Sequence, residues 1–554
     1  MPKMSSVLDV RTTSNDNVIP KQATRTLRLA IIGCGPRGLQ CLEAASRNLS
    51  PETLANLEIS VYEPCRTLGA GCVYDPRQPH VLRMNFASQH VDFWKTDSDS
   101  VTHPSNSLIG WLVDHYPALA ANDQYVPRAI VGEYLNECYA VVEEKLRGAR
   151  SYEVISSHVS CIRKLRSGWE VTADDNTKLA DVVVLTTGHE GLRRSSSLER
   201  DDSARFVFPV QDNLSERCVL PGSSALVRGF GLTSLDAVLA MTEGRGGSFV
   251  QTGRSVEYRS GGREPKTITV YSRTGRPMLA KPTAAIEQVS DHFWACFREQ
   301  LNAISADPST VNFHKDVFSV IQAAAAELLV QHGNSVSAKD VADWYRGWSR
   351  YRMDSRSAYK SMRRSVMVST GERPRDIAYA LGESWRKLYP EIVSLVSHGG
   401  LDALQWPKYQ RIAAEMERIA FGPPADSLRR LLSLIKAGIV DLTNRDDDLD
   451  ATPFDSRIDA VIAAPNQISP SGPLASLLAD GWVERDETTG AIKVDAAGEA
   501  INSRSEERPG LYLFGRATEG WVVGNDTLSR TLHGHIEEWS TSLESRIQTA
   551  SKHE

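Results

Sequence analysis

Three glycines with the spacing Gly33-x-Gly35-x-x-Gly38 constrain this chain more than any other feature, because of what flanks them. The apolar run at residues 27–32 predicts a buried strand, and residues 39–47 have a helical pattern. Gly33 permits a tight turn, Gly35 leaves no Cβ between the backbone and a ligand, and Gly38 lets the helix pack close to the strand. The order of strand, glycine turn and helix therefore predicts a pyrophosphate site at the helix N-terminus.

A second strand and an acidic residue support this prediction. Residues 57–62 have the pattern of a buried strand, and Glu63 follows them directly. In dinucleotide-binding units, an acid at this point binds the ribose hydroxyls. The alternative is an ordinary α/β turn that binds nothing. We favour a dinucleotide, because strand, glycine turn, helix and acid follow one another in the expected order.

The chain contains a second turn of the same kind. Residues 225–228 predict a strand, the pair Gly229-x-Gly231 follows it, and a helix is predicted at 233–242. Ser234 stands in place of the third glycine and is still small. Two dinucleotide folds in one chain imply two nucleotides that exchange electrons across their interface.

The strand after the second turn indicates which nucleotide binds there. Residues 267–273 predict a strand that ends on Ser272-Arg273, where NAD enzymes usually carry an acid. Arginine suits a 2′-phosphate, so we expect NADPH rather than NADH; an exposed arginine at a strand end is the alternative. The candidate residues for this nucleotide are Gly229, Gly231, Leu232, Thr233, Ser234, Ser272 and Arg273.

Composition excludes several other classes of protein. The chain has 554 residues, enough for two or three domains, and is 24% charged and 41% hydrophobic, as soluble globular proteins are. A net charge of −6 does not indicate nucleic acid or a membrane surface as a partner. The sequence contains no run of about 18 uncharged apolar residues, so no transmembrane helix is predicted. Eight scattered cysteines favour reduced cytoplasmic thiols over a disulfide framework.

The pattern along the chain also predicts how the domains are arranged. Residues 1–25 are polar and lack an apolar block, which is typical of a disordered leader. A helical pattern covers 284–436, strand character returns at 459–464, and a terminal helix is predicted at about 528–543. The predicted segments are a leader at 1–25, a first nucleotide domain at 26–215 and 467–554, a second nucleotide domain at 216–283 with a return strand at 451–466, and a helical insertion at 284–450.

The order of these pieces resembles the two-dinucleotide-binding flavoproteins of the glutathione-reductase type, over nearly all of residues 27–543 outside the insertion. The resemblance implies an α/β fold with two Rossmann-like domains, FAD in the first and NADPH in the second. Three segments are similar to a bacterial FAD/NAD(P)-binding family that includes nitrosuccinate synthase, which oxidises the amine of L-aspartate. They are Gly231-Leu-Thr-Ser-Leu-Asp236, Thr242-Glu-Gly-Arg-Gly-Gly247 and Phe421-Gly-Pro-Pro424.

A further likeness links residues 181–189 to the N-hydroxylating flavin monooxygenases of ornithine and lysine. Those enzymes carry Asp, three residues, Leu or Phe, and then Ala-Thr-Gly-Tyr. The segment Asp181-Val-Val-Val-Leu-Thr-Thr-Gly-His189 matches except at Thr186 and His189. This likeness also implies oxidation of an amine.

Several residues outside the glycine motif are candidates for FAD. Asn85 is either a turn residue that bonds its own backbone or an amide that faces the isoalloxazine edge. Arg128 is suited to a phosphate, with a surface ion pair as the alternative. Turns at 187–188 and 515–518 would let the backbone touch the cofactor. The full FAD set is Gly33, Gly35, Pro36, Arg37, Gly38, Glu63, Gly69, Gly71, Asn85, Arg128, Val159, Thr187, Gly188, Gly515, Arg516 and Thr518.

The resemblances imply an FAD-dependent monooxygenase that consumes NADPH and O2 and oxidises the amine of a small amino acid. The implied substrate is L-aspartate, converted to N-hydroxyaspartate or nitrosuccinate, with oxygen added at the C4a carbon of the flavin. Because the flavin carries this chemistry, no catalytic protein residue is predicted. Two alternatives stay open, namely an NADPH:acceptor oxidoreductase or oxidase without oxygen insertion, and a non-catalytic FAD-bound scaffold. Neither nucleic acid nor membrane is expected as a partner, and a homo-oligomer is compatible with the sequence.

Candidate substrate residues are cations, because a dicarboxylate needs at least two positive partners. Arg276, Lys281 and Arg352 are the candidates, the last from a basic run at 346–364 that is otherwise typical of a solvated face.

Disulfide reduction and metal catalysis are not predicted. Six residues separate Cys65 from Cys72, whereas disulfide reductases of this architecture have four residues between their redox cysteines. His533 and His535, two positions apart, would point to different faces of a helix and hold no metal together.

Overall fold

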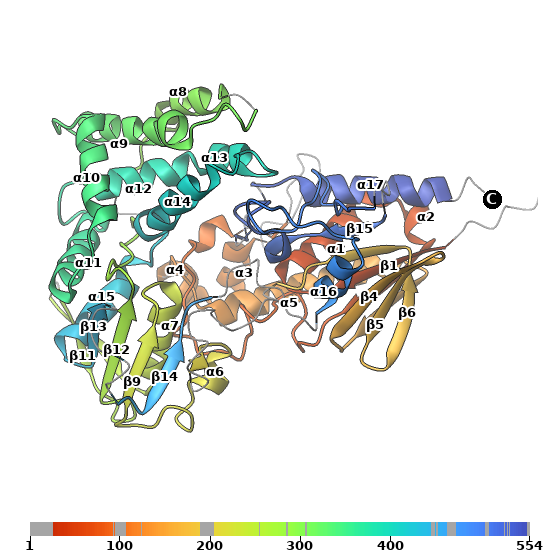
Figure 1. Ribbon diagram of the computed structural model, residues 1–554. Helices are drawn as coiled ribbons and strands as arrows, with labels where there is room; N and C mark the ends of the chain where they lie inside the picture. The colour runs from red at the N-terminus through yellow and green to blue at the C-terminus, as the bar shows by residue number, and fades with distance from the viewer. Residues whose placement is uncertain are drawn as a thin grey trace, which may run out of the picture.

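The computed structural model consists of two parallel sheets with helices around them and a helical layer beside the second sheet (Figure 1). It describes residues 26–91, 93–94, 107–122, 124–188, 204–253, 255–283, 286–304, 307–444, 449, 453–462, 472–504, 509–525, 527–528, 530 and 532–550. The predicted leader at 1–25 lies outside these residues, as do 451–452 and 463–466 at the two ends of the predicted return segment at 451–466.

The first sheet has five parallel strands in the order β15-β7-β1-β2-β3. They are β1 (Leu27–Ile32), β2 (Leu57–Tyr62), β3 (Ser151–Ile155), β7 (Val182–Leu185) and β15 (Leu511–Leu513). Strands β1 and β2 begin and end as predicted, because their apolar runs stop where the glycine turn and Glu63 begin. The carboxyl ends of β1, β7 and β15 lie side by side, since Ile32 pairs with Leu185, and Leu185 with Leu513.

Alternate residues of β1 serve two different cores. Leu29 and Ile31 pack on helices α1 (Pro36–Asn48), α5 (Arg128–Leu146) and α17 (His535–Ala550). Ala30 and Ile32 face the opposite way, against a small antiparallel sheet in the order β4-β5-β6. That sheet and its neighbouring helix are β4 (Val159–Leu165), β5 (Gly168–Ala173), β6 (Asn176–Ala180) and α16 (Pro473–Ala479). Burial on both faces is what a continuous apolar strand predicts.

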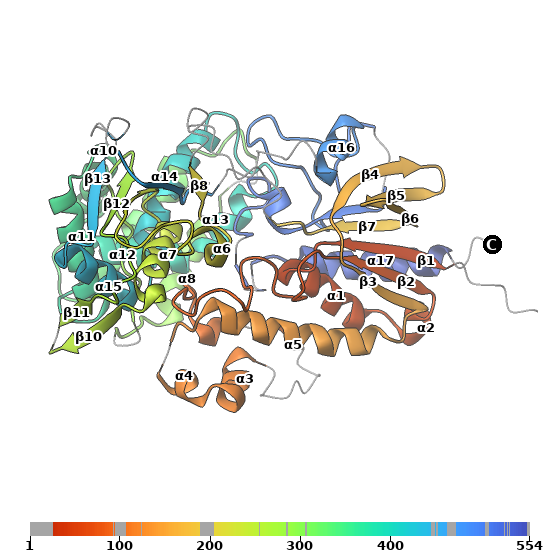
Figure 2. The same cartoon turned by 90° about the horizontal axis from the view of Figure 1, so that it is seen from below.

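The long helix α5 dominates the helical face of the first sheet. Figure 2 shows α5 along this face, with α3 (Leu108–His115) and α4 (Pro117–Asn122) on its outer side. The remaining short helices are α2 (Pro51–Leu54), α6 (Val210–Asn213) and 3-10 turns at Ser88–His90, Glu243–Arg245 and Gly515–Thr518.

The second sheet has five parallel strands in the order β13-β12-β9-β14-β8. They are β8 (Arg205–Phe206), β9 (Ser224–Arg228), β12 (Thr267–Ser272), β13 (Val440–Asn444) and β14 (Ser456–Asp459). Helix α7 (Leu232–Met241) follows β9, and an antiparallel hairpin, β10 (Ser248–Thr252) and β11 (Ser255–Arg259), precedes β12. The return strand predicted at 459–464 ends at Asp459, so only its first residue belongs to the observed strand.

The helices between β12 and β13 form a layer with a core of its own, seen at the upper left of Figure 1. They are α8 (Asp291–Asn302), α9 (Ser319–Gln331) after a π-helical turn at Phe313–Phe318, α10 (Ala338–Arg350), α11 (Ser355–Ser369), α12 (Ile377–Lys387), α13 (Tyr389–Val396), α14 (Trp406–Ala420) and α15 (Ala425–Lys436). The predicted insertion at 284–450 is less separate than expected, because α11 and α15 pack on the second sheet and β13 is one of its strands.

Three sequence-based expectations differ from the structure. The alternating pattern at residues 154–165 favours strand, and the structure divides it between two sheets, as the end of β3 and the whole of β4. The terminal helix predicted at 528–543 starts later, at His535, and runs to Ala550. Its buried side is Trp539, Leu543 and Ile547, at the four-residue spacing of one helical face. The apolar alternation at residues 491–495 also favours strand, but Ile492 and Val494 form only isolated bridges.

Candidate functional site

The first glycine turn is packed tightly against β1 and the residue after β7. A Cβ on Gly33 would lie 2.6 Å from the carbonyl oxygen of Thr186, and a Cβ on Gly38 would lie 2.2 Å from that of Gly33. The Thr186 hydroxyl donates a hydrogen bond to the same Gly33 oxygen at 2.5 Å. Gly33 and Gly38 are therefore required by the chain's own packing, whatever ligand binds.

Gly35 differs from its two neighbours, because the protein leaves room beside it. A Cβ on Gly35 would lie 3.5 Å from the Cα of Gly71, an ordinary contact distance. Gly35 is also the N-cap residue of α1, and no side chain caps the helix there. The free backbone N–H groups of the first turn and the open space beside Gly35 fit the pyrophosphate of FAD.

Glu63 lies at the end of β2, where a ribose is expected. Its carboxylate accepts hydrogen bonds from the backbone N–H groups of Cys34, at 2.7 Å, and Cys65, at 2.9 Å. The side chain is buried. One carboxylate thus fixes both the glycine turn and the loop after β2, and each oxygen keeps a lone pair for a ribose hydroxyl.

The turns after β7 and β15 lie on the same side of the sheet as the glycine turn, because β7 pairs with β1 and β15 pairs with β7 in parallel register. Thr187 and Gly188 are half-buried, and a Cβ on Gly188 would meet no atom within 4 Å. A Cβ on Gly515 would lie 3.1 Å from Cγ of Arg37. Thr518 is buried and donates to the Gly515 carbonyl, so it supports the turn.

Arg37 ties α1 to the C-terminal segment. Its guanidinium donates to the backbone oxygens of Asn525 and Thr527 and to Oε1 of Gln40. Pro36 begins α1 and leaves the next N–H groups to a ligand. Three other FAD candidates have contacts of their own: Val159 opens β4, Arg516 pairs loosely with Glu519, and Asn85 accepts a bond from Lys281 on its carbonyl oxygen.

Arg128 does not present a free guanidinium to a phosphate. It begins α5, and its Nη2 lies 2.5 Å from Oδ2 of Asp236 on α7, while its Nε donates to the Arg83 carbonyl. The ion-pair alternative therefore describes Arg128, but the pair is buried, with exposed side-chain fractions of 14% and 9%. Burial raises the pKa of Asp236 above its ordinary value, and the Arg128 charge opposes that rise. The pair joins the helix of the first sheet to the helix of the second.

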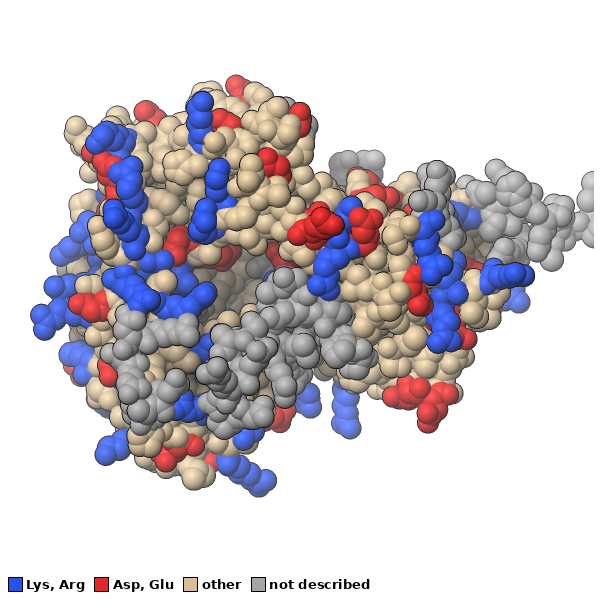
Figure 3. Space-filling model, viewed as in Figure 1, with Lys and Arg blue, Asp and Glu red and all other residues tan. Residues whose placement is uncertain are grey.

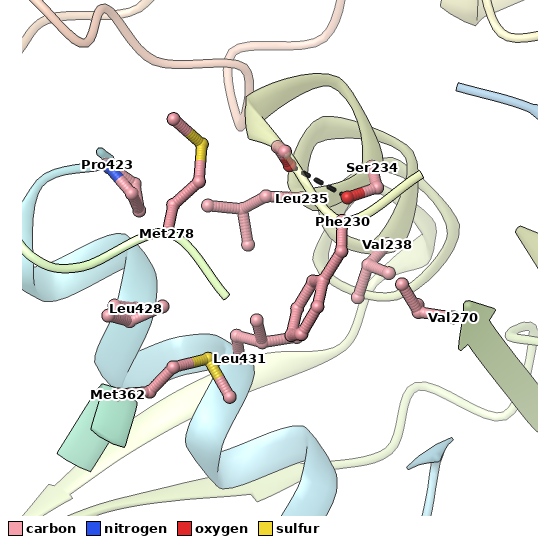
Figure 4. Close-up of a pocket in the computed structure, with 11 residues that line it drawn as sticks. Phe230, Ser234, Leu235, Val238, Val270, Met278, Met362, Pro423, Leu428 and Leu431 are labelled. Carbon is pink, nitrogen blue, oxygen red and sulfur yellow. Dashed lines mark hydrogen bonds between the residues drawn. The ribbon is translucent and has the colours of Figure 1, made fainter. Parts of the chain in front are cut away.

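The second glycine turn is bounded by an apolar cluster (Figure 4). Gly231 is the N-cap of α7, and the Ser234 hydroxyl donates to the Gly231 carbonyl at 2.7 Å. Leu232 and Thr233 are half-buried in the first turn of α7. Beside them, Phe230, Met278 and Leu428 line a cavity of about 20 Å³. This space holds no more than a water molecule, so a nucleotide must lie outside it.

Arg273 stands in a cluster of cations that the sequence did not predict. Arg273 is exposed at the end of β12, and Ser272 accepts a bond from the Gly275 N–H. Arg418, on α14, is near enough to feel the charge of Arg273. Burial is the main cause that lowers the pKa of the Arg418 guanidinium, and the charges of Arg276 and Arg273 lower it further. The negative charge of Glu415 acts in the opposite direction. A site with this excess of positive charge suits a phosphate.

Arg276, a predicted substrate residue, lies in a buried ion pair. Its side chain is 7% exposed and forms a two-point ion pair with Glu415, at 2.9 and 2.7 Å. Nη1 donates to the Tyr351 carbonyl. Trp348 also donates to Glu415. These contacts attach the segment after β12 to α14, and the substrate role of Arg276 stays a prediction.

The other two substrate candidates remain accessible to different degrees. Lys281 is half-buried, donates to the Asn85 carbonyl and lies over the Phe421 ring, so it bridges the two sheet units. Arg352 is exposed between α10 and α11. Figure 3 shows Lys and Arg side chains gathered over the side of the molecule where α10 and α11 lie. The exposed cations of the basic run are Arg346, Arg350, Arg352, Arg356, Lys360, Arg363 and Arg364.

A larger cavity lies within the helical layer. Its volume is about 720 Å³, and Trp344, Trp348 and Tyr379 contribute aromatic surface to it. Arg364 lines the same cavity and is paired with Asp376 at 2.7 Å. The space is large enough for a small ligand.

His533 and His535 do not occupy one helix, contrary to the expectation from their spacing. His533 precedes α17, and His535 is the first residue of this helix. Their rings are stacked, with centroids 5.1 Å apart and 13° between the ring planes. Burial, reinforced by nearby positive charge, lowers the pKa of His533 to about 4 and that of His535 to about 2. Among the described residues, no group of three or more His, Cys, Asp or Glu side chains could hold a metal ion, and no helix is long and apolar enough to cross a membrane.

Comparison with known proteins identifies relatives that match most of the chain. The profile of a family described as FAD-NAD(P)-binding matches residues 30–190. L-aspartate N-monooxygenase (nitrosuccinate-forming) of Streptomyces davaonensis is 24% identical, over 90% of this chain and 89% of its own. Nitrosuccinic acid synthase of Aspergillus oryzae is 25% identical, over 76% of this chain and 73% of its own.

Solved structures show the same fold. The reduced form of ornithine hydroxylase from Pseudomonas aeruginosa is similar with a TM-score of 0.50 and 11% identity, over 94% of this chain and 100% of that one. The predicted α/β class with Rossmann-like domains is thereby confirmed. The predicted cofactors, FAD and a nicotinamide nucleotide, agree with the FAD-NAD(P)-binding profile that matches residues 30–190.

Replacing Gly35 with valine should abolish FAD binding without unfolding the chain, because the protein leaves room for a Cβ that the pyrophosphate would need. We expect the affinity for FAD to fall by at least about tenfold, or ~1.4 kcal/mol. Flavin absorbance per polypeptide after gel filtration measures the loss. Gly347→Val is the matched control, because a Cβ at Gly347 meets no atom within 4 Å. Retention of the yellow colour by Gly35→Val would refute the assignment.

Replacing Arg128 with alanine should lower the free energy of unfolding by about 3–5 kcal/mol near pH 8, because Asp236 is left buried without its partner. Loss of the guanidinium raises the pKa of Asp236 further. A carboxyl whose pKa is raised in the folded state favours folding while it is protonated, and that contribution is lost as pH rises through the folded pKa. The deficit should therefore be smaller at pH 5 than at pH 8 in denaturant titrations.

Arg77→Ala provides the control for the Arg128 variant. Arg77 pairs with Asp75 on the surface, with 73% of its side chain exposed, so its loss should leave the free energy of unfolding nearly unchanged. Equal deficits for Arg128→Ala at both pH values would show that protonation of Asp236 does not relieve the loss.

Proposed function

We propose that this chain is an FAD- and NADPH-dependent N-monooxygenase that oxidises the amine of a small amino acid, with L-aspartate as the substrate. The observation that carries the proposal is the similarity to two enzymes named for nitrosuccinate formation, one of them over 90% of the chain. The backbone at both glycine turns supports it, because a Cβ on Gly35 or Gly231 would meet protein atoms only at ordinary contact distances, 3.5 Å and 3.9 Å, and the chain's own packing does not require glycine there.

The chain's own groups would hold FAD around the first turn. The N–H groups at the start of α1 would bind the pyrophosphate, and Glu63 would accept from a ribose hydroxyl. The turns at Gly188 and Gly515 would bring the backbone against the ring system. When bound, FAD takes a hydride from NADPH and activates O2 for transfer to an amine nitrogen. No protein nucleophile is needed for this reaction.

NADPH would lie along the second turn, with its 2′-phosphate near Arg273. The start of α7 would bind the pyrophosphate, as the start of α1 does in the first unit. Arg418 adds a second positive charge on the same side, and its Nε makes no hydrogen bond within the described residues. Because Glu415 is already engaged by Arg276, it neutralises only part of the cluster. The net charge favours a dianionic phosphate over a free ribose hydroxyl.

The substrate would bind where the two sheet units meet. Lys281 spans this boundary, because it follows β12 in the chain and reaches Asn85 in the first unit. Its ammonium is a point charge suited to one carboxylate of a dicarboxylic amino acid. The chain must also bind the amine in its neutral form, since only a free lone pair accepts oxygen, and must exclude water from the reacting atoms.

The proposal is tested by incubating the purified holoenzyme with NADPH, air and L-aspartate. We expect NADPH oxidation to depend on L-aspartate and hydroxylamine or nitroso product to form in proportion to the NADPH consumed. L-Asparagine serves as the matched control, because it has the same shape and lacks the side-chain charge. Substrate-independent NADPH oxidation with no N-oxygenated product from a panel of amino acids would refute N-oxygenation and favour an NADPH:acceptor oxidoreductase or oxidase.

Arg273→Ala should reduce the preference for NADPH over NADH. Loss of one charge-assisted contact corresponds to about tenfold, or ~1.4 kcal/mol, in the ratio of kcat/KM values for the two nucleotides. Arg411→Ala is the control, because Arg411 is exposed on α14, the helix that carries Arg418. An unchanged ratio in Arg273→Ala would move the phosphate site away from the end of β12.

A further inference from the structure

The loop after β2 brings two thiols together. Sγ of Cys65 and Sγ of Cys72 lie 3.6 Å apart, although six residues separate them in the chain. Cys72 is exposed and Cys65 is half-buried. The distance is that of a thiol hydrogen bond, and a disulfide needs the sulfurs about 1.5 Å closer. Rotation of the two side chains and a small shift of the exposed residue supply such a movement.

Both ends of this loop are attached to the predicted FAD site. The backbone N–H of Cys65 donates to Glu63, whose other oxygen accepts from the glycine turn. At the far end, the Cα of Gly71 is the nearest atom to the position of a Cβ on Gly35. The thiol pair therefore closes the segment that runs from the expected ribose position to the expected pyrophosphate position.

The middle of the loop is held by the rest of the first unit. The N–H of Gly69 donates to the Cys34 carbonyl at 2.7 Å. A Cβ on Gly69 would lie 2.6 Å from the Leu135 carbonyl on α5 and 2.8 Å from the Leu39 side chain on α1. With its middle seated between two helices, the loop can open for FAD chiefly at its outer side, where the two cysteines meet.

We propose that Cys65 and Cys72 form a peroxide-reactive dithiol site, whose reversible disulfide closes this loop over bound FAD. The thiolate of Cys72 attacks hydrogen peroxide, which gives a sulfenic acid on Cys72 and hydroxide. The thiol of Cys65 then attacks that sulfur, the S–S bond forms, and the sulfenic oxygen leaves as water after taking up the Cys65 proton. Two thiols are oxidised, one peroxide is reduced, and a dithiol reductant reverses the change.

The order of attack follows from exposure and charge. The hydrogen bond to Cys72 first, and then burial, raise the pKa of Cys65, so Cys65 suits the part of the second thiol, which attacks after the first has reacted. Cys72 is also the one that peroxide in solution can reach. Reactive cysteines have this combination of thiolate character, exposure and a partner thiol within reach. The site depends on FAD binding but not on the proposed amine oxidation.

The experiment treats the FAD-loaded protein with one equivalent of hydrogen peroxide. Intact mass should show the loss of two hydrogens, and peptide mapping after differential alkylation should place the disulfide between Cys65 and Cys72. Dithiothreitol should restore the mass. FAD release on dilution, followed by flavin fluorescence, should be at least about threefold slower in the oxidised protein, because a closed loop has fewer open conformations.

Cys72→Ser and Cys296→Ser separate the site from general thiol oxidation. Cys296 is another exposed cysteine, so Cys296→Ser should behave as the unchanged protein, whereas Cys72→Ser should form no such disulfide and show no peroxide effect on FAD release. Thiols that stay unreacted, or a disulfide between other cysteines, would overturn the proposed site. A Cys65–Cys72 disulfide with an unchanged FAD release rate would overturn the loop closure. Neither result bears on whether L-aspartate is oxidised.

Discussion

The close approach of α1 to β1 is the constraint on which the first nucleotide unit depends. A Cβ on Gly38 would lie 2.2 Å from the Gly33 carbonyl oxygen, so the helix can lie this near the strand only because that atom is missing. The same carbonyl accepts the Thr186 hydroxyl, which adds the turn after β7 to the contact. Once these three segments are in place, Gly35 remains as the residue with room beside it. Tight packing on two sides thus defines where a ligand can enter.

Charge holds the second unit to the first. The carboxylate of Asp236, on α7, is buried away from solvent, and the guanidinium of Arg128, on α5, balances its negative charge. An intact buried ion pair adds little net stability to the folded state, whereas removal of one partner lowers the free energy of unfolding strongly. The main effect of the pair is therefore to specify one relative placement of the two helices. A hydride can pass between two nucleotides only at contact distance, and that geometry requires the two units to be held in register. Lys281 makes a second link between them at Asn85.

The sequence predicts the parts of this structure that depend on local pattern. Strands β1 and β2 and helices α1 and α7 follow from apolar runs and glycine turns, because backbone requirements act between near neighbours. The partners of long charged side chains do not follow from such patterns. Arg276 pairs with Glu415, which lies 139 positions further along the chain. Local residue spacing therefore cannot distinguish an arginine that binds substrate from one in a core ion pair.

The candidate site shows the same division between local and distant contacts. The glycines and Glu63 lie together where their motifs predict, and their roles in binding stay predictions. Arg418 was missed because it comes from the helical layer, whose sequence shows only amphipathic periodicity. Cys65 and Cys72 were considered only against the spacing of disulfide reductases, whereas the turn between them, with Gly69 and Gly71 at positive φ, brings their sulfurs together.

The insertion between β12 and β13 also affects how the chain must assemble. Ile268 pairs with Val440 in neighbouring parallel strands, yet the whole helical layer is synthesised between them. Contacts this distant in sequence are slow to form while the intervening chain is open. A layer with its own apolar core can collapse first and bring its two ends together, which shortens the loop that the sheet must close. The helical layer would then act as an internal folding aid, and β13 would join the sheet among the last of its strands.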